Sequence, residues 1–202
     1  MISYLLGSIP TAYIAGKLKG IDISKKGNKN VGASNTFSLL GKLPGLIVLI
    51  IDIGKGYLAV WLASFLSGNH PFIPLLAVVF TLIGHNWMFP IGFKGGKGSA
   101  AMVGALIYLA PFSIPVLFIV FIPVASFIVK DSFLGQGIAM FFFSFLMWFW
   151  KGTYYWLIFV LLLTIVYSLR CLNLYKTYFT QKRRYLNPLV RFIIKPFIKK
   201  KI

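Results

Sequence analysis

The sequence predicts an all-α fold, a polytopic membrane helix bundle of about seven transmembrane helices. Of the 202 residues, 58% are hydrophobic and the mean hydropathy is +0.84, whereas a soluble domain is roughly half apolar. Apolar runs recur along nearly the whole chain, and in hydrocarbon only helices and closed barrels satisfy every backbone polar group. These runs lack strict alternation, which favours helices over strands.

The apolar runs place the helices, since about 20 residues are needed to cross a bilayer. The predicted helices are 2–17, 43–67, 71–91, 99–111, 113–129, 134–150 and 153–169. Pro111 and Pro115 could instead join a broken pair into one re-entrant feature, which leaves a range of five to seven spans. The first run does not look like a cleavable signal peptide, because no basic stretch precedes it. Without any repeat period, residues 1–202 are expected to form a single integral membrane domain.

The basic residues orient the bundle, because short cytoplasmic loops carry an excess of Lys and Arg. With seven spans and an internal C-terminus, 19 of the 21 basic residues fall on the inner side. Only Lys151 falls outside, and Lys55 lies within a span. We therefore expect a bacterial inner-membrane protein with an external N-terminus, a cytoplasmic C-terminus and a site formed by the cytoplasmic loops.

The C-terminal residues 172–202 form a basic, mixed apolar tail that is too polar to span. An interfacial helix on an anionic leaflet is the natural interpretation. Such anchors also occur without any catalytic role, so the tail favours no particular activity.

The charge balance, 21 basic against 3 acidic residues, predicts anionic partners. Nucleic acid is disfavoured, because membrane spans separate the basic residues rather than a soluble module gathering them. Anionic lipid headgroups and phosphorylated metabolites fit better. Cys171, His70 and His85 offer no metal-ligand set, so we expect neither a metal nor another cofactor.

A glycine-rich segment after the third predicted helix is the strongest local motif. Gly84-His85-Asn86-Trp87 leads to Gly92-Phe93-Lys94-Gly95-Gly96-Lys97-Gly98-Ser99, directly before another apolar helix. Glycines allow backbone amides to approach an anion, and the following helix N-terminus and the lysines add positive charge. The segment is not a Walker A motif, since Ile91 and Gly98 occupy positions that need Gly and Ser or Thr. A positive-inside loop that merely turns is an equally good interpretation of its composition.

A second polar segment lies in the first predicted inner loop, Gly27-Asn28-Lys29-Asn30-Val31-Gly32-Ala33-Ser34-Asn35. Its amides and hydroxyl suit a phosphate or a glycerol hydroxyl. Taken alone, an ordinary polar turn explains it better, because Gly and Asn are common turn residues.

Two charges lie inside the second predicted helix. Asp52 and Lys55 are three residues apart, where unpaired charges are costly, and an i,i+3 ion pair that positions the helix is the favoured interpretation. His85 ends a helix near the glycine segment and is predicted to act as an orienting donor ahead of a base or an interfacial ring. Pro90 and Leu75 occupy the positions five residues after the two histidines, so the local His-plus-Asp motif of many lipid acyltransferases is absent.

These residues resemble a known family, the bacterial acyl-phosphate:glycerol-3-phosphate acyltransferases, which are small seven-helix inner-membrane enzymes. Tyr4-Leu5-Leu6-Gly7-Ser8-Ile9-Pro10-Thr11-Ala12 is similar to the family's opening. The following segments appear in the family's order: Gly32-Ala33-Ser34-Asn35, Leu40-Gly41-Lys42, Asp52 through Lys55-Gly56, and Gly84-His85-Asn86 through Gly98. The match is specific over residues 4–100 and faint afterwards.

The resemblance implies transfer of a fatty acyl group from acyl phosphate to glycerol 3-phosphate, giving lysophosphatidic acid for phospholipid synthesis. The phosphate of the donor can take the proton of the attacking hydroxyl, so no protein nucleophile is needed. The implied catalytic residues are Lys97 and His85. The implied substrate-binding residues are Asn28, Asn30, Ser34, Asn35, Lys94, Gly95, Gly96, Ser132 and Asn173.

The chain departs from the family pattern at several positions. Asn28 replaces a serine, Ser38 an arginine and Phe133 a serine, and the expected Arg-His pair is not reproduced around Cys171. The acid expected soon afterwards is missing as well. A non-catalytic relative that binds lipid or phosphate, or assists another membrane protein, is therefore the alternative to an acyltransferase. A transporter is a weaker third option, because no repeated halves are visible.

Overall fold

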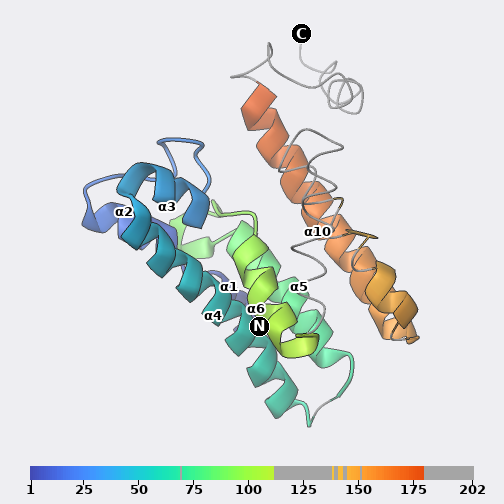
Figure 1. Ribbon diagram of the computed structural model, residues 1–202. Helices are drawn as coiled ribbons and strands as arrows, with labels where there is room; N and C mark the ends of the chain where they lie inside the picture. Colours follow the sequence, from blue (N-terminus) through green and yellow to red (C-terminus); the bar gives the residue numbers. More distant parts are fainter. Residues whose placement is uncertain (69, 112–137, 139–140, 143–144, 151, 180–202) are drawn as a thin grey trace. The chain divides into compact units, whose positions relative to one another are not determined.

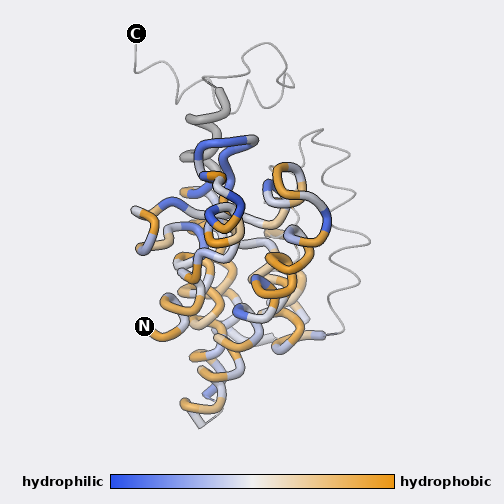
Figure 2. Tube along the Cα trace, turned by 90° about the vertical axis from the view of Figure 1, so that its left-hand side faces the viewer, coloured by the Kyte–Doolittle hydropathy of each residue, from blue (hydrophilic) through white to orange (hydrophobic). Residues whose placement is uncertain are grey.

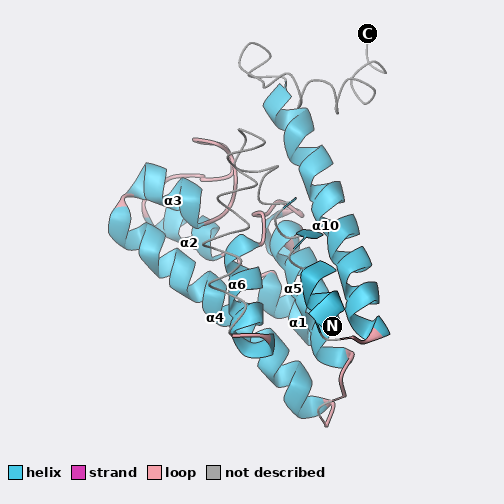
Figure 3. Ribbon diagram, turned by 45° about the vertical axis from the view of Figure 1, so that its right-hand side comes forward, coloured by secondary structure: helices cyan, strands magenta, loops and turns pink. Residues whose placement is uncertain are grey.

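The computed structural model describes residues 1–68, 70–111, 138, 141–142, 145–150 and 152–179, the last nine by their backbone alone. The chain divides into two compact units, Met1–Ile114 and Pro115–Ile202. All regular elements in the described ranges are helices, as the sequence predicts (Figure 3). Each unit is considered by itself below.

The first predicted helix is in fact two helices. α1 (Ile2–Gly7) and α2 (Thr11–Leu18) are separated by Ser8–Pro10, so the expectation of one helix over 2–17 was wrong. Pro10 cannot donate to the preceding turn and its ring clashes there, which ends a helix. The break leaves the Ile9 carbonyl and the Thr11 hydroxyl available to other helices.

α3 (Ala33–Leu40) follows the asparagine-rich segment and was not predicted. It is only eight residues long, which is too short for an apolar run to mark it. Gly41, at φ 93°, separates α3 from α4 (Lys42–Leu66). The two helices pack closely, because a Cβ at Gly45 would collide with the Phe37 ring.

α4 confirms the predicted second helix almost residue for residue. Its 25 residues extend about 37 Å, and among the residues whose side chains are described it is the one helix long and apolar enough to cross a membrane. The helices at Ile73–Asn86, Ser99–Leu109 and Tyr154–Arg170 are apolar but shorter. α4 packs against α6 through glycines, with Gly56 against Ala101 O and Gly104 against Ile53 O.

The third predicted helix, 71–91, ends earlier than expected. α5 covers Ile73–Asn86, and a separate 3-10 turn, η1, covers Phe89–Ile91. Trp87 has left the helical region at φ −134° and ψ 73°, and Pro90 cannot donate a helical hydrogen bond. α6 (Ser99–Leu109) begins after Gly98, as predicted, and stops two residues before Pro111.

The second unit is described in part. α10 spans Tyr154–Phe179, so the predicted helix 153–169 continues ten residues further, into the predicted tail 172–202. Residues 113–129 and 180–202 lie outside the described residues. Of the predicted helix 134–150, the described residues are helical.

The polar loops of the first unit gather at one end of its helices. The chain passes this end after α2, before α4, and between α5 and α6 (Figure 1). Figure 2 shows the hydrophilic colours concentrated in these loops, while the residues of the helices are mainly hydrophobic. Eight lysines belong to this end of the unit: Lys17, Lys19, Lys25, Lys26, Lys29, Lys42, Lys94 and Lys97. The described residues at the opposite end, 64–68, 70–74 and 106–111, include neither Lys nor Arg.

Candidate functional site

The two polar segments singled out in the sequence lie side by side in the folded unit. The Val31 amide donates to the Gly95 carbonyl across 3.4 Å, which connects the asparagine loop, residues 27–32, to the glycine loop, residues 94–98. A Cβ at Gly96 would collide with the Val31 carbonyl. Residues 64 positions apart are thus held in contact at the N-terminus of α6.

The asparagine loop is held in shape by one fully buried side chain, that of Asn35. Its Nδ2 donates to the carbonyls of Ile23 and Lys26, each at 3.1 Å, and its Oδ1 accepts from the Asn28 amide at 3.1 Å. Asn35 was predicted to bind substrate, and that remains a prediction. In the structure its amide is engaged by the loop itself.

Other predicted residues of this segment surround the loop. Asn28 is exposed, and its Oδ1 accepts from the Asn30 amide at 3.0 Å. The Asn30 side chain is buried, and its Oδ1 has no hydrogen-bond partner within the described residues. Ser34 is exposed in the first turn of α3, and its carbonyl accepts from Ser38 Oγ at 3.2 Å. Asn30 therefore offers a buried acceptor, and Asn28 and Ser34 lie at the surface.

Lys29 adopts a left-handed backbone conformation, with φ 60°. Glycine adopts positive φ without steric cost, whereas other residues do so uncommonly. The chain therefore makes a glycine-like turn at this point and places a lysine on it.

Asp22 lies in the segment that precedes the asparagine loop. Its carboxylate accepts from the Ser24 hydroxyl at 2.7 Å and the Ser24 amide at 3.1 Å, and it pairs with Lys25 at 3.5 Å. The Ser24 hydrogen bonds and the nearby Lys25 lower the pKa of Asp22 below its ordinary value. The carboxylate is therefore charged at neutral pH and fixes the start of the loop.

The glycine loop is anchored at both ends. Met88 and Lys94 form an isolated antiparallel bridge, with the Met88 amide donating to the Lys94 carbonyl at 3.2 Å. The Gly96 amide donates to the His85 carbonyl at 3.0 Å, and Gly98 begins α6 with φ 81°. No side chain caps α6, so its first-turn amides point into the loop region with the positive end of the helix dipole.

The predicted residues of the glycine loop differ in exposure. Gly95 and Gly96 are buried, Lys97 is half-buried and Lys94 is exposed. Gly95 leaves no room for a side chain, because a Cβ there would collide with the carbonyls of His85 and Asn86. The glycine loop thus carries an exposed Lys94 and a half-buried Lys97 on a closely packed backbone.

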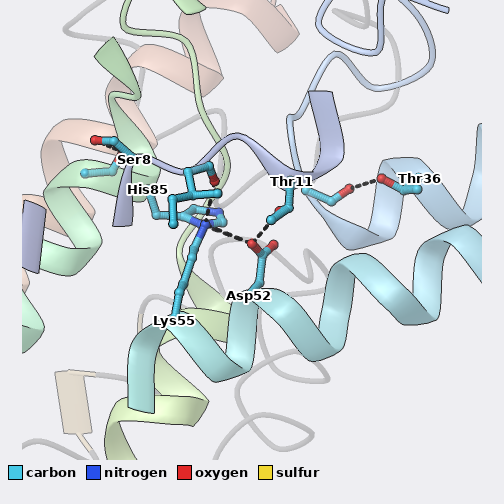
Figure 4. A network of polar contacts seen from close by, with 9 residues as sticks. Ser8, Thr11, Thr36, Asp52, Lys55 and His85 are labelled. Carbon is cyan, nitrogen blue, oxygen red and sulfur yellow. Dashed lines mark hydrogen bonds and ion pairs between the residues drawn. The ribbon is translucent and has the colours of Figure 1, made fainter. Parts of the chain in front are cut away.

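His85 is buried, and Figure 4 shows its side chain beside Lys55 and Asp52. Its Nδ1 is 4.0 Å from Asp52 Oδ1, and its Nε2 faces Gly96 closely enough that a Cβ there would collide with it. Next to it, Asn86 is fully buried, and neither polar atom of its side chain has a hydrogen-bond partner in the described part of the chain.

The predicted ion pair in α4 is confirmed. Lys55 Nζ lies 2.8 Å from Asp52 Oδ1 and donates to the Ile9 carbonyl at 3.1 Å, while Thr11 Oγ1 donates to Asp52 Oδ1 at 2.7 Å (Figure 4). Sequence reasoning missed the approach of Asp52 to His85, because α4 and α5 bring together residues 33 positions apart. The presence of Asp52 inside an apolar helix could have pointed to the site, since an ionisable residue in a membrane span is by default a candidate functional residue.

Two predicted residues cannot be placed. Ser132 lies outside the described residues, as does Phe133. Asn173 lies in α10, along with Cys171, in the part described by its backbone alone. Among the described residues, no group of His, Cys, Asp and Glu could hold a metal ion.

Comparison with known protein families identifies the family to which this chain belongs. The model of the family described as "Glycerol-3-phosphate acyltransferase" matches residues 1–177. The chain belongs to the glycerol-3-phosphate acyltransferase family. The family and the helical membrane fold expected from the sequence are thereby confirmed.

Curated relatives agree with this assignment. "Glycerol-3-phosphate acyltransferase 2" of Moorella thermoacetica is 44% identical over 128 residues, which are 63% of this chain and 65% of that protein. "Glycerol-3-phosphate acyltransferase 2" of Dehalococcoides mccartyi is 41% identical over 151 residues, which are 74% of this chain and 70% of that protein.

Solved structures of the family show the same fold. The glycerol 3-phosphate form of PlsY (YgiH), an integral membrane glycerol 3-phosphate acyltransferase, has a TM-score of 0.76 and 26% identity, and the match covers 95% of each chain. The lysophosphatidic acid form has a TM-score of 0.70 and 28% identity, with 83% of each chain covered. This chain is therefore similar to an integral membrane protein over nearly its whole length.

Proposed function

We propose that this chain transfers a fatty acyl group from acyl phosphate to glycerol 3-phosphate, giving lysophosphatidic acid and inorganic phosphate. The observation that carries the proposal is the hydrogen bond from Val31 to Gly95, which joins the asparagine and glycine loops at the N-terminus of α6. One loop supplies neutral donors and acceptors, and the other supplies backbone amides and two lysines. The names of the relatives and of the similar structures support the same acceptor.

Each group in the site has a role in this reaction. Lys97, Lys94 and the uncapped first-turn amides of α6 bind phosphate, because charge-assisted hydrogen bonds to anions are about twice as strong as neutral ones. Asn30, with its buried acceptor oxygen, and Asn28 and Ser34 orient the hydroxyls of the acceptor. His85 supports the loop from below, and Asn35 holds the asparagine loop in the required shape.

The bond changes need no protein nucleophile. The 1-hydroxyl oxygen of glycerol 3-phosphate attacks the acyl carbonyl carbon, and the bond between that carbon and the phosphate oxygen breaks. The leaving phosphate takes the hydroxyl proton. The protein contributes by holding two anions and an acyl chain in the reactive arrangement, which lowers the entropic cost of the encounter. Ser132 and Asn173, which the family resemblance implies as substrate-binding residues, remain predictions.

The site would face the cytoplasm of a bacterial inner membrane, with the N-terminus outside and the C-terminus inside. The eight lysines at the loop end support this orientation, because the positive-inside rule places such loops in the cytoplasm. They also give the loop end an attraction for anionic lipids.

Purified protein in detergent, supplied with acyl phosphate and glycerol 3-phosphate, tests the proposal. We expect lysophosphatidic acid and inorganic phosphate in equal amounts, with the release of both strongly reduced by Lys97→Ala. Binding of glycerol 3-phosphate without any transfer would overturn the proposal. That outcome would favour a non-catalytic relative, in which the changes at Asn28 and Ser38 have removed the activity.

A further inference from the structure

Asp52 and Lys55 form a buried ion pair in the middle of the apolar helix α4, and fold stability alone does not account for it. Their exposed fractions are 1% and 4%. Replacing a buried ion pair by apolar residues of similar size is often neutral or stabilising, and charges in a membrane span commonly mark function. We therefore asked what the carboxylate of Asp52 contacts besides its lysine.

The carboxylate is fixed from two sides and directed toward a third. Thr11 Oγ1 at 2.7 Å and Lys55 Nζ at 2.8 Å both contact Oδ1. Lys55 is fixed in turn by the Ile9 carbonyl at 3.1 Å, in the break between α1 and α2. The same Oδ1 lies 4.0 Å from His85 Nδ1. This separation exceeds a hydrogen bond, but such contacts are often long without substrate and shorten in the complex.

The opposite edge of the imidazole ring reaches the glycine loop. His85 Nε2 lies against Gly96, where no Cβ fits, and the His85 carbonyl accepts from the Gly96 amide at 3.0 Å. Lys97 follows directly in the chain. Because Gly96 packs directly against the ring of His85, a rotation of the ring displaces the backbone next to Lys97.

We propose that Asp52 is a positioning residue for the phosphate-binding glycine loop and acts through the ring of His85. The inference rests on the proposed function of that loop. Thr11 and Lys55 fix the carboxylate, the carboxylate orients the Nδ1 edge of His85, and the Nε2 edge supports Gly96. The helix break at Ser8–Pro10 belongs to this chain of contacts, because it supplies the carbonyl of Ile9 that Lys55 needs.

The test removes both charges together, so that neither is left buried alone. In the full-length Asp52→Asn/Lys55→Met variant, we expect kcat/KM for glycerol 3-phosphate to fall about 100-fold, as a misplacement near 1 Å does. The melting temperature should stay within about 4 °C of wild type.

Thr11→Val keeps the ion pair but removes one hydrogen bond, and should reduce kcat/KM about five-fold. Thr81 lies one turn before His85, and its hydroxyl donates to the Ala77 carbonyl at 2.7 Å within the same helix. Thr81→Val is the matched control and should change nothing.

Two further measurements separate positioning from simple folding. If Asp52 acts through His85, adding Asp52→Asn/Lys55→Met to His85→Ala should cause no further loss, because residues in one network are not additive. The nitrogen-15 shifts of the imidazole report the tautomer of each histidine, and His85 and His70 are the two in the chain. The double variant should move the His85 signal and leave that of His70 unchanged.

Several results would overturn the inference. One is a wild-type kcat/KM in the double variant. Another is a further loss of kcat/KM when the double variant is combined with His85→Ala. A third is an unchanged nitrogen-15 shift of His85 in the double variant. If the double variant does not fold, Thr11→Val decides, and a loss that persists undiminished in the His85→Ala background overturns the inference. The imidazole signals need no turnover, so an inactive wild-type protein would defeat the proposed function while this link to His85 could still be tested.

Discussion

Lys97 lies between two buried glycines and is itself half-buried, which makes it the cation of the glycine loop least accessible to water. We expect Lys97→Ala to lower the affinity for phosphate-bearing substrates about 10- to 100-fold, since a hydrogen bond to a charged group contributes about 1.5–3 kcal/mol. Lys97→Arg should restore little, because a planar guanidinium does not replace a compact ammonium between tight glycines. Inhibition by inorganic phosphate and KM for glycerol 3-phosphate measure both effects. Wild-type affinity in Lys97→Ala would mean that the lysine serves only membrane orientation.

Two fully buried asparagines provide a stability comparison. Asn35 makes three hydrogen bonds to the loop backbone, whereas neither polar atom of Asn86 has a partner among the described residues. Asn35→Leu should cost about 2–4 kcal/mol, because it leaves polar groups unpaired. Asn86→Leu should be neutral or slightly stabilising, since a buried polar group without a partner is itself unfavourable. Thermal unfolding in one detergent measures the two variants, and an equal loss in both would contradict the expectation.

At the residue scale, the sequence predicted which segments form the site better than it predicted what each side chain does. Glycine and lysine spacing marked the loop at 94–98, and the structure places it against the asparagine loop. The spacing could not show that Asn35 is engaged internally. It could not show that Asp52 approaches His85 either, because both contacts depend on how helices pack.

At the scale of elements, α4 and α6 approach each other through glycines. A Cβ at Gly56 would meet the Ala101 carbonyl, whereas Gly54, on the same helix, has nothing within 4 Å of an added Cβ. We expect Gly56→Ala to push α6 away and to lower both the melting temperature and the activity, because α6 carries the glycine loop at its start. Gly54→Ala is the matched control and should gain up to about 1 kcal/mol from helix propensity. Equal behaviour of the two variants would show that the α4 and α6 contact is tolerant.

Apolar runs predicted α4 and α6 closely, but they could not find α3, the break between α1 and α2, or the early end of α5. α3 is short and amphiphilic, and each of the other two features occurs near a proline inside an apolar stretch. Hydropathy averages over such breaks. The proline positions were visible in the sequence, and the rule that proline interrupts a helix would have placed both.

For the whole molecule, the orientation in the membrane remains a prediction with a direct test. Because α4 is long enough to span, the loop that contains Lys29 and the turn that contains His70 should lie on opposite sides. Reporter fusions at these residues should give a cytoplasmic signal at Lys29 and an external signal at His70. Cytoplasmic signals at both positions would show that α4 does not cross and that the predicted helix count is wrong.

The ion pair within α4 also has a consequence for how the protein is made. A helix that enters the bilayer with an isolated charge pays a penalty of about 2.5–3.5 kcal/mol for that residue. Asp52 and Lys55 lie three residues apart on one helix, so α4 carries its own counter-ion into the membrane. The additional partners, Ile9 and Thr11, come earlier in the chain and have already left the ribosome when α4 emerges. His85 comes later in the chain, so the ion pair within α4 does not depend on it.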